Sequence, residues 1–321
     1  MKALITAPFA KEEVNRLSEY MQVELCGWGK DGVELSKKEL LEKIPDYDIF
    51  ISEMEFADRD VIDAGKRLKL IGSVRGTPFN IDSAYAKERG IVALFAPGRN
   101  AVGVAELTIF LMGELVRNIT ISNEYLRRGE WDESDEMSYV KFRGTELCGK
   151  TLGLLGLGAI GTRVARIANA FHMNVQCYDP YLNPENAKEL HVKQTGLEEL
   201  FETSDFISVH CRVTPQTTGM LDYALFSKMK PTAFFINTAR SAVTKEADLR
   251  RILREGKIAG AALDVFDKEP MGQNPDWLSL QNCYLVPHIG GATHEVVSHH
   301  SRIMADDLIR FAKGEPPINV L

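Results

Sequence analysis

The sequence has few cysteines, and they are not paired. Five are scattered along 321 residues without a C-x-x-C motif: Cys26, Cys148, Cys177, Cys211 and Cys283. This spacing indicates neither a disulfide framework nor a zinc site. Cys26, Cys177 and Cys283 lie in apolar runs typical of strands, which predicts buried free thiols.

The sequence also lacks a hydrophobic run long enough to span a membrane. The most apolar segment, residues 101–116, is too short and contains Glu106 and Glu114. Residues 1–10 do not resemble a signal peptide, because their apolar run is short and is broken by Pro8. The net charge of −7 disfavours nucleic acid or an anionic membrane as the main partner. We therefore expect a cytoplasmic protein that attracts anionic ligands with local arginines.

A cluster of histidines near the end of the chain lacks the spacing of a metal site. His294-Glu295 resembles the start of a zinc-protease motif, but Ser298 stands where that motif requires its second histidine. His299 comes one residue later, on a different face of a helix. We predict no metal, and we interpret His294, His299 and His300 as solvated or domain-contact side chains.

Residues 150–179 carry the pattern of a dinucleotide-binding unit. An apolar run at 151–155 has the length of a strand, and apolar residues recur at helical spacing over 159–171. A second predicted strand, 175–178, ends at Asp179. Between the first strand and the helix lies a G-x-G-x-x-G turn formed by Gly156, Gly158 and Gly161.

Each part of this pattern has a chemical reason. The first glycine makes the tight turn, the second lets backbone approach a pyrophosphate, and the third lets helix pack on strand. The pyrophosphate then lies at the positive N-terminus of the helix. Asp179 can bind both hydroxyls of an adenine ribose and would repel a 2′-phosphate, which favours NAD over NADP. The alternative is a structural turn in an α/β domain that binds no nucleotide.

The remaining pattern predicts two α/β domains. In the first part, strands are predicted at 3–7, 22–26, 48–52, 68–73 and 91–95, with helices at 12–20, 37–43, 59–66 and 82–89. In the second part, further strands are predicted at 206–210, 233–237, 260–265 and 284–286, and a helix at 244–255. This alternation indicates parallel sheets flanked by helices.

Two long helices mark the domain boundaries. Residues 101–117, apolar nearly all round, are expected to begin the second domain. Residues 293–312 are expected to return to the first, so we predict a discontinuous substrate domain, 1–98 plus 293–321, and an NAD-binding domain, 99–292. The polar stretch 119–147 is either an arm on a partner subunit or a surface excursion.

Three polar residues follow predicted strand ends, where open α/β sheets bind their ligands: Arg240, Glu269 and His288. Arginine can bind a carboxylate bidentately. Histidine can give a proton to a carbonyl oxygen as hydride arrives, and glutamate can hold the imidazole in its charged form. Taken singly, they could be a surface charge, a loop acid and a capping residue. Together they predict reduction of a 2-oxo acid.

Over nearly its whole length the chain resembles the D-isomer-specific 2-hydroxyacid dehydrogenases, which include D-3-phosphoglycerate, glyoxylate/hydroxypyruvate and D-lactate dehydrogenases. Besides the glycine turn, the resemblance rests on Asn80-Ile81-Asp82, Asn100 with Val104-Ala105-Glu106, Gly149-Lys150-Thr151-Leu152-Gly153, Asn237-Thr238-Ala239-Arg240, Leu263-Asp264-Val265, Glu269-Pro270 and Pro287-His288-Ile289-Gly290-Gly291. It implies an α/β fold of two doubly wound parallel-sheet domains, a flavodoxin-like substrate domain and a Rossmann NAD-binding domain.

The resemblance also implies roles for further residues. Those expected at the cofactor are Ala159 and Ile160 through their backbone, His210 and Thr217 at its flanks, Thr238, Ala239 and Asp264 on the nicotinamide side, and Gly290. The backbone of Val74, Arg75 and Gly76 would hold the substrate carboxylate. Without such roles, Asp264 would be a loop acid or helix cap, and His210 a strand-end residue.

Two stretches depart from the family pattern. In 74–79, Arg75 could bind a second anionic group of the substrate or form a salt bridge with a neighbouring acid. In 52–55, acids and a methionine stand where phosphoglycerate dehydrogenases tend to carry arginines. Formate dehydrogenases, which share the architecture, have Gln at the position of Glu269, which disfavours formate.

We therefore predict an NAD-dependent D-2-hydroxyacid dehydrogenase, an oxidoreductase acting on the CH–OH group of small 2-hydroxy acids. The D-stereochemistry is implied by the resemblance alone. We expect a homodimer whose domains close over the substrate. The alternatives are a D-3-phosphoglycerate dehydrogenase without a regulatory domain and an NAD-sensing, corepressor-like binding protein.

Overall fold

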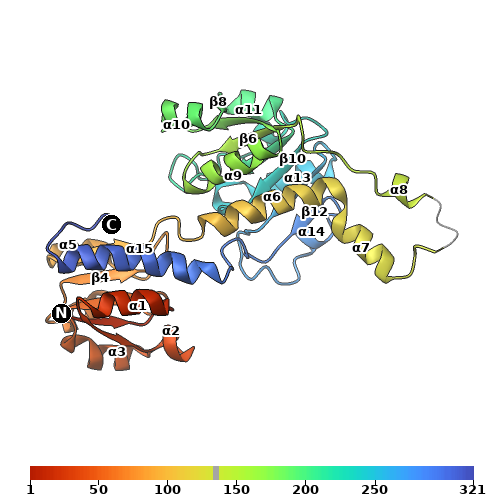
Figure 1. The fold of residues 1–321 in the computed structure, drawn as a ribbon. Coiled ribbons are helices and arrows are strands. Elements are labelled where there is room, and N and C mark those ends of the chain that lie inside the picture. Colours follow the sequence, from red (N-terminus) through yellow and green to blue (C-terminus); the bar gives the residue numbers. More distant parts are fainter. Residues whose placement is uncertain (133–136) are drawn as a thin grey trace. The chain divides into compact units, whose positions relative to one another are not determined.

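The computed structural model describes residues 1–132 and 137–321. Two compact units make up the chain (Figure 1). Unit 1 is Met1–Asn100 with Ala292–Leu321, and unit 2 is Ala101–Gly291. Each has its own sheet and its own hydrophobic core.

Unit 1 is built on five parallel strands in the order β2-β1-β3-β4-β5, the strand order of flavodoxin-like sheets. The strands are β1 (Lys2–Ile5), β2 (Gln22–Leu25), β3 (Ile49–Ser52), β4 (Leu70–Ser73) and β5 (Val92–Phe95). Every residue of β3 and β4 is buried, because apolar clusters cover both faces of the sheet. This is the burial expected of a parallel sheet.

The helices of unit 1 are α1 (Lys11–Ser18), α2 (Trp28–Asp31), α3 (Lys37–Lys43), the 3₁₀ turn η1 (Ile44–Asp46), α4 (Arg59–Ala64), α5 (Ser83–Glu88) and α15 (Glu295–Ala312). Ser36, Asp58 and Asp82 cap α3, α4 and α5 by accepting backbone N–H groups. Helix α15 packs on the β1-β3-β4 core through Met304 and Leu308. The last segment of the chain therefore completes the core of the first.

Unit 2 has seven parallel strands in the order β12-β11-β10-β9-β6-β7-β8. They are β6 (Thr151–Leu155), β7 (Asn174–Tyr178), β8 (Val192–Gln194), β9 (Phe206–Val209), β10 (Phe234–Asn237), β11 (Gly260–Leu263) and β12 (Cys283–Leu285). The strand order reverses between β6 and β9, a switch point of the kind where Rossmann folds bind dinucleotides. The predicted strands occur within two residues of their expected bounds. The pattern missed β8, a three-residue edge strand in which only Val192 is buried.

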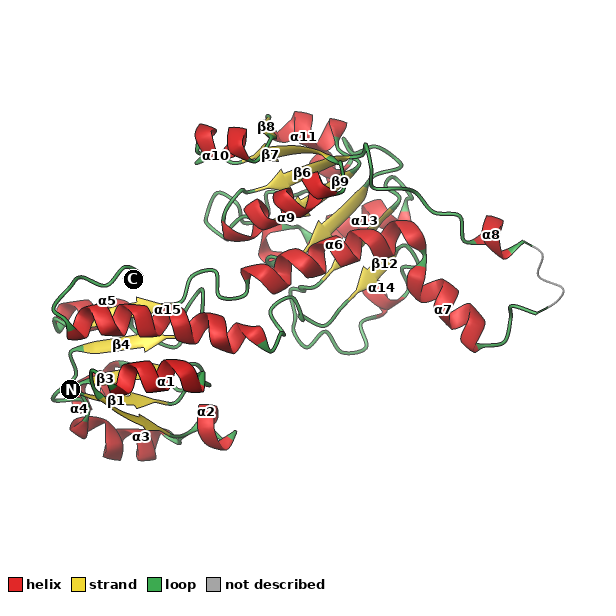
Figure 2. Cartoon of the chain, viewed as in Figure 1, coloured by secondary structure: helices red, strands yellow, loops and turns green. Residues whose placement is uncertain are grey.

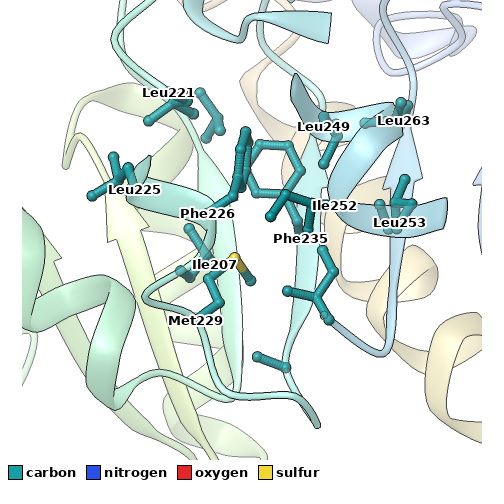
Figure 3. Close-up of a cluster of buried hydrophobic side chains, with 14 of the residues drawn as sticks. Ile207, Leu221, Leu225, Phe226, Met229, Phe235, Leu249, Ile252, Leu253 and Leu263 are labelled. Atoms are coloured by element: carbon teal, nitrogen blue, oxygen red, sulfur yellow. The ribbon is translucent and has the colours of Figure 1, made fainter. Parts of the chain in front are cut away.

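The helices of unit 2 are α6 (Ala101–Arg117), α7 (Ile119–Arg127), α8 (Ser138–Lys141), α9 (Ala159–Ala170), α10 (Pro184–Glu189), α11 (Leu197–Thr203), α12 (Tyr223–Phe226), the 3₁₀ turn η2 (Ser241–Val243), α13 (Glu246–Arg254) and α14 (Pro275–Leu278). Helices α6 and α9 cover one face of the sheet. Helices α11, α12 and α13 cover the other, where Phe226 and Leu249 pack against Phe235 of β10 (Figure 3).

Helices α7 and α8 extend away from the sheet of unit 2 (Figure 2). They lie in the stretch 119–147 that we interpret as an arm or a surface excursion; residues 133–136 of it lie outside the described chain. Tyr139 is 83% exposed and Trp131 is 58% exposed. Tyr125 is the one buried side chain among the described residues of this stretch, which therefore contribute little to the core of unit 2.

All five cysteines are free thiols. Cys177 is buried as predicted, whereas Cys26 and Cys283 are only partly buried, because one follows an edge strand and the other lies on one. Burial raises the pKa of Cys177 to about 12. Among the described residues, no helix combines the length and apolarity needed to cross a membrane.

Candidate active site

The glycine turn joins β6 to α9 as the sequence predicts. Gly156 has a φ of 97°, a conformation that side chains disfavour. A Cβ on Gly161 would lie 2.3 Å from the carbonyl oxygen of Gly156, so only glycine lets the helix approach the strand end. At Gly158 a Cβ would meet nothing within 4 Å. The second glycine therefore borders open space, as binding of a pyrophosphate requires.

The groups around this turn fit a dinucleotide. Ala159 and Ile160 open α9, where first-turn N–H groups lack helical acceptors and attract anions. Asp179 follows β7, and its two oxygens accept the N–H groups of Leu157 and Tyr181, each at 2.9 Å. Each oxygen keeps a further lone pair that can accept a ribose hydroxyl.

His210, which follows β9, has a ring nitrogen that is available to a ligand. Its Nε2 lies 2.9 Å from the hydroxyl of Ser208. Its Nδ1 is buried and has no hydrogen-bond partner among the described residues. Burial lowers the pKa of His210 to about 3, so the ring is neutral at physiological pH. A buried nitrogen without a partner is the kind of atom that a bound ligand satisfies.

Three other predicted cofactor residues use their polar groups within unit 2. The Thr217 hydroxyl donates to the Arg212 carbonyl at 2.6 Å. The Thr238 hydroxyl lies 3.0 Å from that of Thr108 on α6. The N–H of Ala239 donates to Asn237 at 3.0 Å. These bonds shape the loops after β9 and β10, and the predicted contacts with the cofactor stay predictions.

Asp264 and Gly290 interact directly with each other. Asp264 is buried, and its two oxygens accept the N–H groups of Ile289 at 2.6 Å and Gly290 at 2.8 Å. Burial raises the pKa of Asp264, against the effect of these bonds. A Cβ on residue 290 would lie 2.9 Å from the Asp264 carboxylate. Asp264 therefore fixes the turn that follows His288.

His288 and Glu269 form a close pair beyond the ends of β12 and β11. Nδ1 of His288 lies 2.6 Å from Oε2 of Glu269, whose Oε1 accepts the N–H of Phe266 at 2.9 Å. Their side chains are 44% and 35% exposed, so solvent and small molecules reach them. His288 has a φ of 53°, a left-handed conformation that costs energy in a non-glycine residue.

Arg240 follows β10 on the same edge of the sheet. Its side chain is exposed, and Nη1 donates to the Ala239 carbonyl at 2.7 Å. The charge of Arg240 acts on Glu269. Burial raises the pKa of Glu269, but the bond to His288 and the charges of His288 and Arg240 lower it, and the net result is a lowered pKa. The three residues predicted to act together are therefore gathered in unit 2.

The predicted substrate-binding backbone lies in unit 1, after β4. The N–H of Val74 donates to the Ser52 carbonyl at 3.0 Å, and that of Arg75 to the Ser73 hydroxyl at 3.3 Å. Among the described residues, the N–H of Gly76 has no such acceptor. Of the three N–H groups expected to hold a carboxylate, only that of Gly76 is unused inside the unit.

Among the described residues, the Arg75 side chain has no carboxylate partner. Its Nε donates to the Glu53 carbonyl at 2.8 Å, and its guanidinium lies 4.5 Å from the centre of the Phe79 ring. The Glu53 carboxylate pairs instead with Arg99 at 2.7 Å. Within the described chain, Arg75 thus does not form the salt bridge that was one of its two interpretations. Burial lowers its pKa, against the charge of Glu53.

The histidines in α15 and at its N-cap differ from one another. His300 is 1% exposed: Nε2 donates to the Pro8 carbonyl at 2.7 Å, and Nδ1 lies 3.1 Å from Nη1 of Arg99. Burial lowers its pKa to about 4. Of the two alternatives, solvated or domain-contact, the first is therefore wrong for His300, whereas His294 is exposed. The described residues contain no gathering of three or more potential ligands that could hold a metal ion.

Comparison with known proteins shows which family has a similar sequence. Residues 109–290 match the family model of the "D-isomer specific 2-hydroxyacid dehydrogenase, NAD binding domain". The putative 2-hydroxyacid dehydrogenase YoaD of Bacillus subtilis is 37% identical, over all of this chain and 93% of that protein. A D-3-phosphoglycerate dehydrogenase of Methanocaldococcus jannaschii is 38% identical over all of this chain, which spans 59% of its length.

A solved structure extends the likeness to the whole fold. The TT0316 protein of Thermus thermophilus superposes with a TM-score of 0.83 at 31% identity, and the match covers 100% of both chains. Matching residues include the glycine turn and the loops that carry Arg240, Glu269 and His288, all within 109–290. This chain belongs to the D-isomer-specific 2-hydroxyacid dehydrogenase family.

Proposed function

We propose that the chain is an NAD-dependent D-2-hydroxyacid dehydrogenase, which reversibly transfers hydride between NADH and a small 2-oxo acid. The observation that carries this proposal is the 2.6 Å contact between His288 and Glu269, with the charge of Arg240 acting on the same carboxylate. These side chains follow strands of the sheet whose switch point holds the glycine turn. Unit 1 would be the substrate domain and unit 2 the NAD-binding domain.

The residues divide the chemistry of reduction between them. Bound nicotinamide supplies the hydride for the carbonyl carbon. Nδ1 of His288 is engaged by Glu269, so Nε2 is the atom that gives its proton to the carbonyl oxygen. Glu269 stays ionised because its pKa is lowered, and it stabilises the charged imidazole. Arg240 holds the substrate carboxylate with two parallel hydrogen bonds. In the oxidative direction, His288 takes the proton back.

Asp179 supports NAD rather than NADP as the cofactor. Its carboxylate stands after β7, where the ribose of a dinucleotide is expected. A 2′-phosphate there would place a second anion against it. We expect NADH to bind more than about tenfold tighter than NADPH, a difference of about 1.4 kcal/mol. Fluorescence titration of both cofactors tests this, and equal affinities would contradict it.

Arg75 supports a substrate with a second anionic group, such as a phosphate or a distal carboxylate. Its guanidinium is positioned by the Glu53 carbonyl and the Phe79 ring, while Arg99 neutralises the Glu53 carboxylate. The charge of Arg75 therefore has no carboxylate within ion-pair distance among the described residues. The alternative of 3-phosphoglycerate as the hydroxy acid draws support from the Methanocaldococcus relative, although this chain spans only 59% of that protein.

A homodimer is supported by exposed apolar side chains on α6 and α7. Phe110 is 68% exposed, and Ile119 and Ile121 are each 55% exposed. Apolar side chains exposed together on neighbouring helices are typical of protein–protein interfaces. Analytical ultracentrifugation should give twice the 35.9 kDa mass of the chain; a monomer at micromolar concentration would contradict the proposal.

One experiment tests the activity as a whole. Glyoxylate, hydroxypyruvate, phosphohydroxypyruvate, pyruvate and longer 2-oxo acids are each supplied with NADH, and absorbance of the reduced cofactor is followed. We expect turnover of at least one. If none turns over while NADH still binds tightly, the NAD-sensing, corepressor-like function is favoured instead.

A further inference from the structure

Glu246 is a buried carboxylate to which neither the sequence pattern nor the mechanism above gives a role. It is the first residue of α13, and its side chain is 9% exposed. Helix α13 is fixed to the sheet by Leu249, Ile252 and Leu253 (Figure 3). A carboxylate at this place is therefore attached to a rigid part of unit 2.

The Glu246 carboxylate binds three donors from three different segments. Oε1 accepts the N–H of Asp267 at 2.7 Å, in the loop that follows β11. Oε2 accepts the indole N–H of Trp277 at 3.2 Å and Nη1 of Arg250 at 3.1 Å. Trp277 is 1% exposed, so its indole N–H depends on this acceptor.

The bond to Asp267 ties Glu246 to the acid–base pair. Residues 266 and 267 are consecutive, and each gives its backbone N–H to a different glutamate: Phe266 to Glu269 and Asp267 to Glu246. The first bond and the 2.6 Å contact with His288 use the two oxygens of Glu269. The bond to Glu246 fixes the next peptide of the same loop to α13.

The surroundings of Glu246 also reach the loop that carries Arg240. A cavity of about 10 Å³ is lined by Glu246, Trp277 and Asn237. Asn237 donates through Nδ2 to the Arg240 carbonyl at 3.0 Å. Burial raises the pKa of Glu246, which opposes its ionised form, yet all three neighbours are donors that need an acceptor. The bonds from Asp267 and Trp277 and the charge of Arg250 act against this effect of burial.

We infer that Glu246 is a positioning residue: through the Asp267 peptide it holds the loop so that Glu269 stays within hydrogen-bond distance of Nδ1 of His288. Glu246 does not touch the reacting atoms and acts only through Glu269. The expected effect on kcat rests on the proposed function, whereas the hydrogen bonds that position Glu269 do not.

The test replaces Glu246 by glutamine and compares it with a matched carboxylate. An amide keeps one oxygen but turns an NH₂ group toward donors, so either the bond from Asp267 or both bonds from Trp277 and Arg250 are lost. Asp205 is the control. It accepts the Thr151 N–H at 2.8 Å and pairs with Lys230, but it precedes β9 and so lies at the amino ends of the strands, away from the proposed site.

We expect Glu246→Gln to lower kcat by about 10- to 100-fold, since a misplacement of about 1 Å can cost on the order of 10²-fold. The Kd for NADH should stay within about twofold, because the glycine turn is untouched. Asp205→Asn should lower the thermal midpoint but leave kcat unchanged. Glu246→Asp keeps the charge on a shorter side chain, so its kcat should lie between those of Glu246→Gln and the unmodified protein. If Glu246→Gln does not fold, Glu246→Asp is compared with the unmodified protein in its place.

Two further measurements separate positioning from a general loss of stability. In a Glu269→Gln background, Glu246→Gln should lower kcat no further, because residues that act as a unit are not additive. The Nδ1 proton of His288, assigned by its loss in His288→Gln, gives an NMR signal that needs no substrate. We expect it to shift or broaden in Glu246→Gln but not in Asp205→Asn.

Each outcome decides one claim. An unchanged His288 proton signal in Glu246→Gln, or additive losses of kcat in the double variant, overturns the positioning role. If the unmodified protein reduces no 2-oxo acid, the proposed function fails, and the NMR comparison still decides whether Glu246 positions the pair.

Discussion

The two units have the same architecture but differ in what stands at the carboxyl ends of their strands. In unit 2, His288 and Glu269 are bonded to each other and exposed. In unit 1, the polar side chains after the strands are mostly buried and bonded within the unit: Glu55 accepts from the Thr6 hydroxyl, and Asn80 donates to Ser52. The fold alone therefore does not make a reactive edge; solvent exposure of paired titratable groups does.

His288 in unit 2 and His300 in unit 1 differ in the same way, in their exposure and in their partners. His288 is bonded to a carboxylate and is exposed, so it can exchange a proton with a ligand. His300 is buried between the Pro8 carbonyl and Arg99, which holds it in the neutral form. The first is suited to acid–base chemistry and the second to holding α15 in unit 1. Arg75 is the exception in unit 1, because it lacks an anionic partner among the described residues.

Replacement of His288 should give the largest effect, because the proposed mechanism gives the acid–base chemistry to the exposed pair His288 and Glu269. We expect His288→Ala to lower kcat by about 10²- to 10⁴-fold, the usual contribution of a general acid. NADH should bind with nearly unchanged affinity, as measured by fluorescence titration. His300→Ala serves as the contrast in the other unit and should retain kcat in whatever fraction stays folded. Unchanged turnover in His288→Ala would remove that residue from the mechanism.

Substitution in the glycine turn should give the next largest effect, since the part of the chain that matches an NAD-binding domain lies in unit 2. Gly158→Ala should fold normally but weaken NADH binding by more than about tenfold, because its Cβ would occupy space that the pyrophosphate needs. Gly196 is a matched control: it too is an N-cap glycine beside open space, and Gly196→Ala should bind NADH normally.

Gly161→Ala completes this series through a different mechanism. Its Cβ would lie 2.3 Å from the Gly156 carbonyl oxygen, so strain rather than loss of ligand space is expected. The free energy of unfolding should fall by about 1 to 3 kcal/mol, the usual cost of overpacking. Thermal or denaturant unfolding measures this. Equal stability of the Gly161 and Gly158 variants would contradict the distinction.

Arg75 tests whether unit 1 contributes to ligand recognition. Arg75→Met should raise the KM for a 2-oxo acid with a second anionic group by roughly tenfold or more, since a charged hydrogen bond contributes about 1.5 to 3 kcal/mol. The KM for glyoxylate should not change. Arg59 also stacks on an aromatic ring, that of Tyr85, and Arg59→Met is the matched control. A uniform rise in KM for all substrates would contradict a role specific to the second anion.

The smallest effect concerns stability as a function of pH. The pKa of His300 is lowered from 6.5 to about 4 by burial. A group with a depressed pKa stabilises the folded state above its unfolded value, and this contribution is lost as pH falls below about 6.5. We expect His300 to account for about 1 to 2 kcal/mol of the decrease in unfolding free energy between pH 6.5 and 5. Denaturant unfolding of His300→Gln should show a shallower decrease, whereas exposed His294→Gln should not.

The local pattern of the sequence determined the elements and the type of each loop. Apolar runs and helical spacing located the described strands other than β8 within two residues, since burial on both faces of a parallel sheet demands continuous apolar strands. The three glycines indicated the turn after β6, because each is required by local backbone geometry. Arg240, Glu269 and His288 were found because parallel strands end at one edge, so residues far apart in sequence meet there.

Only the tertiary structure decided which polar groups are free and which are used. The sequence did not predict that the N–H groups of Val74 and Arg75 are bonded to other parts of unit 1, or that Asp264 is committed to the turn after His288. Nor did it distinguish Glu246, the buried acceptor of Asp267 and Trp277, from any other glutamate at the start of a helix. The physical reason is that burial and hydrogen-bond partners come from segments distant in sequence, whereas periodicity and motif spacing record only local geometry.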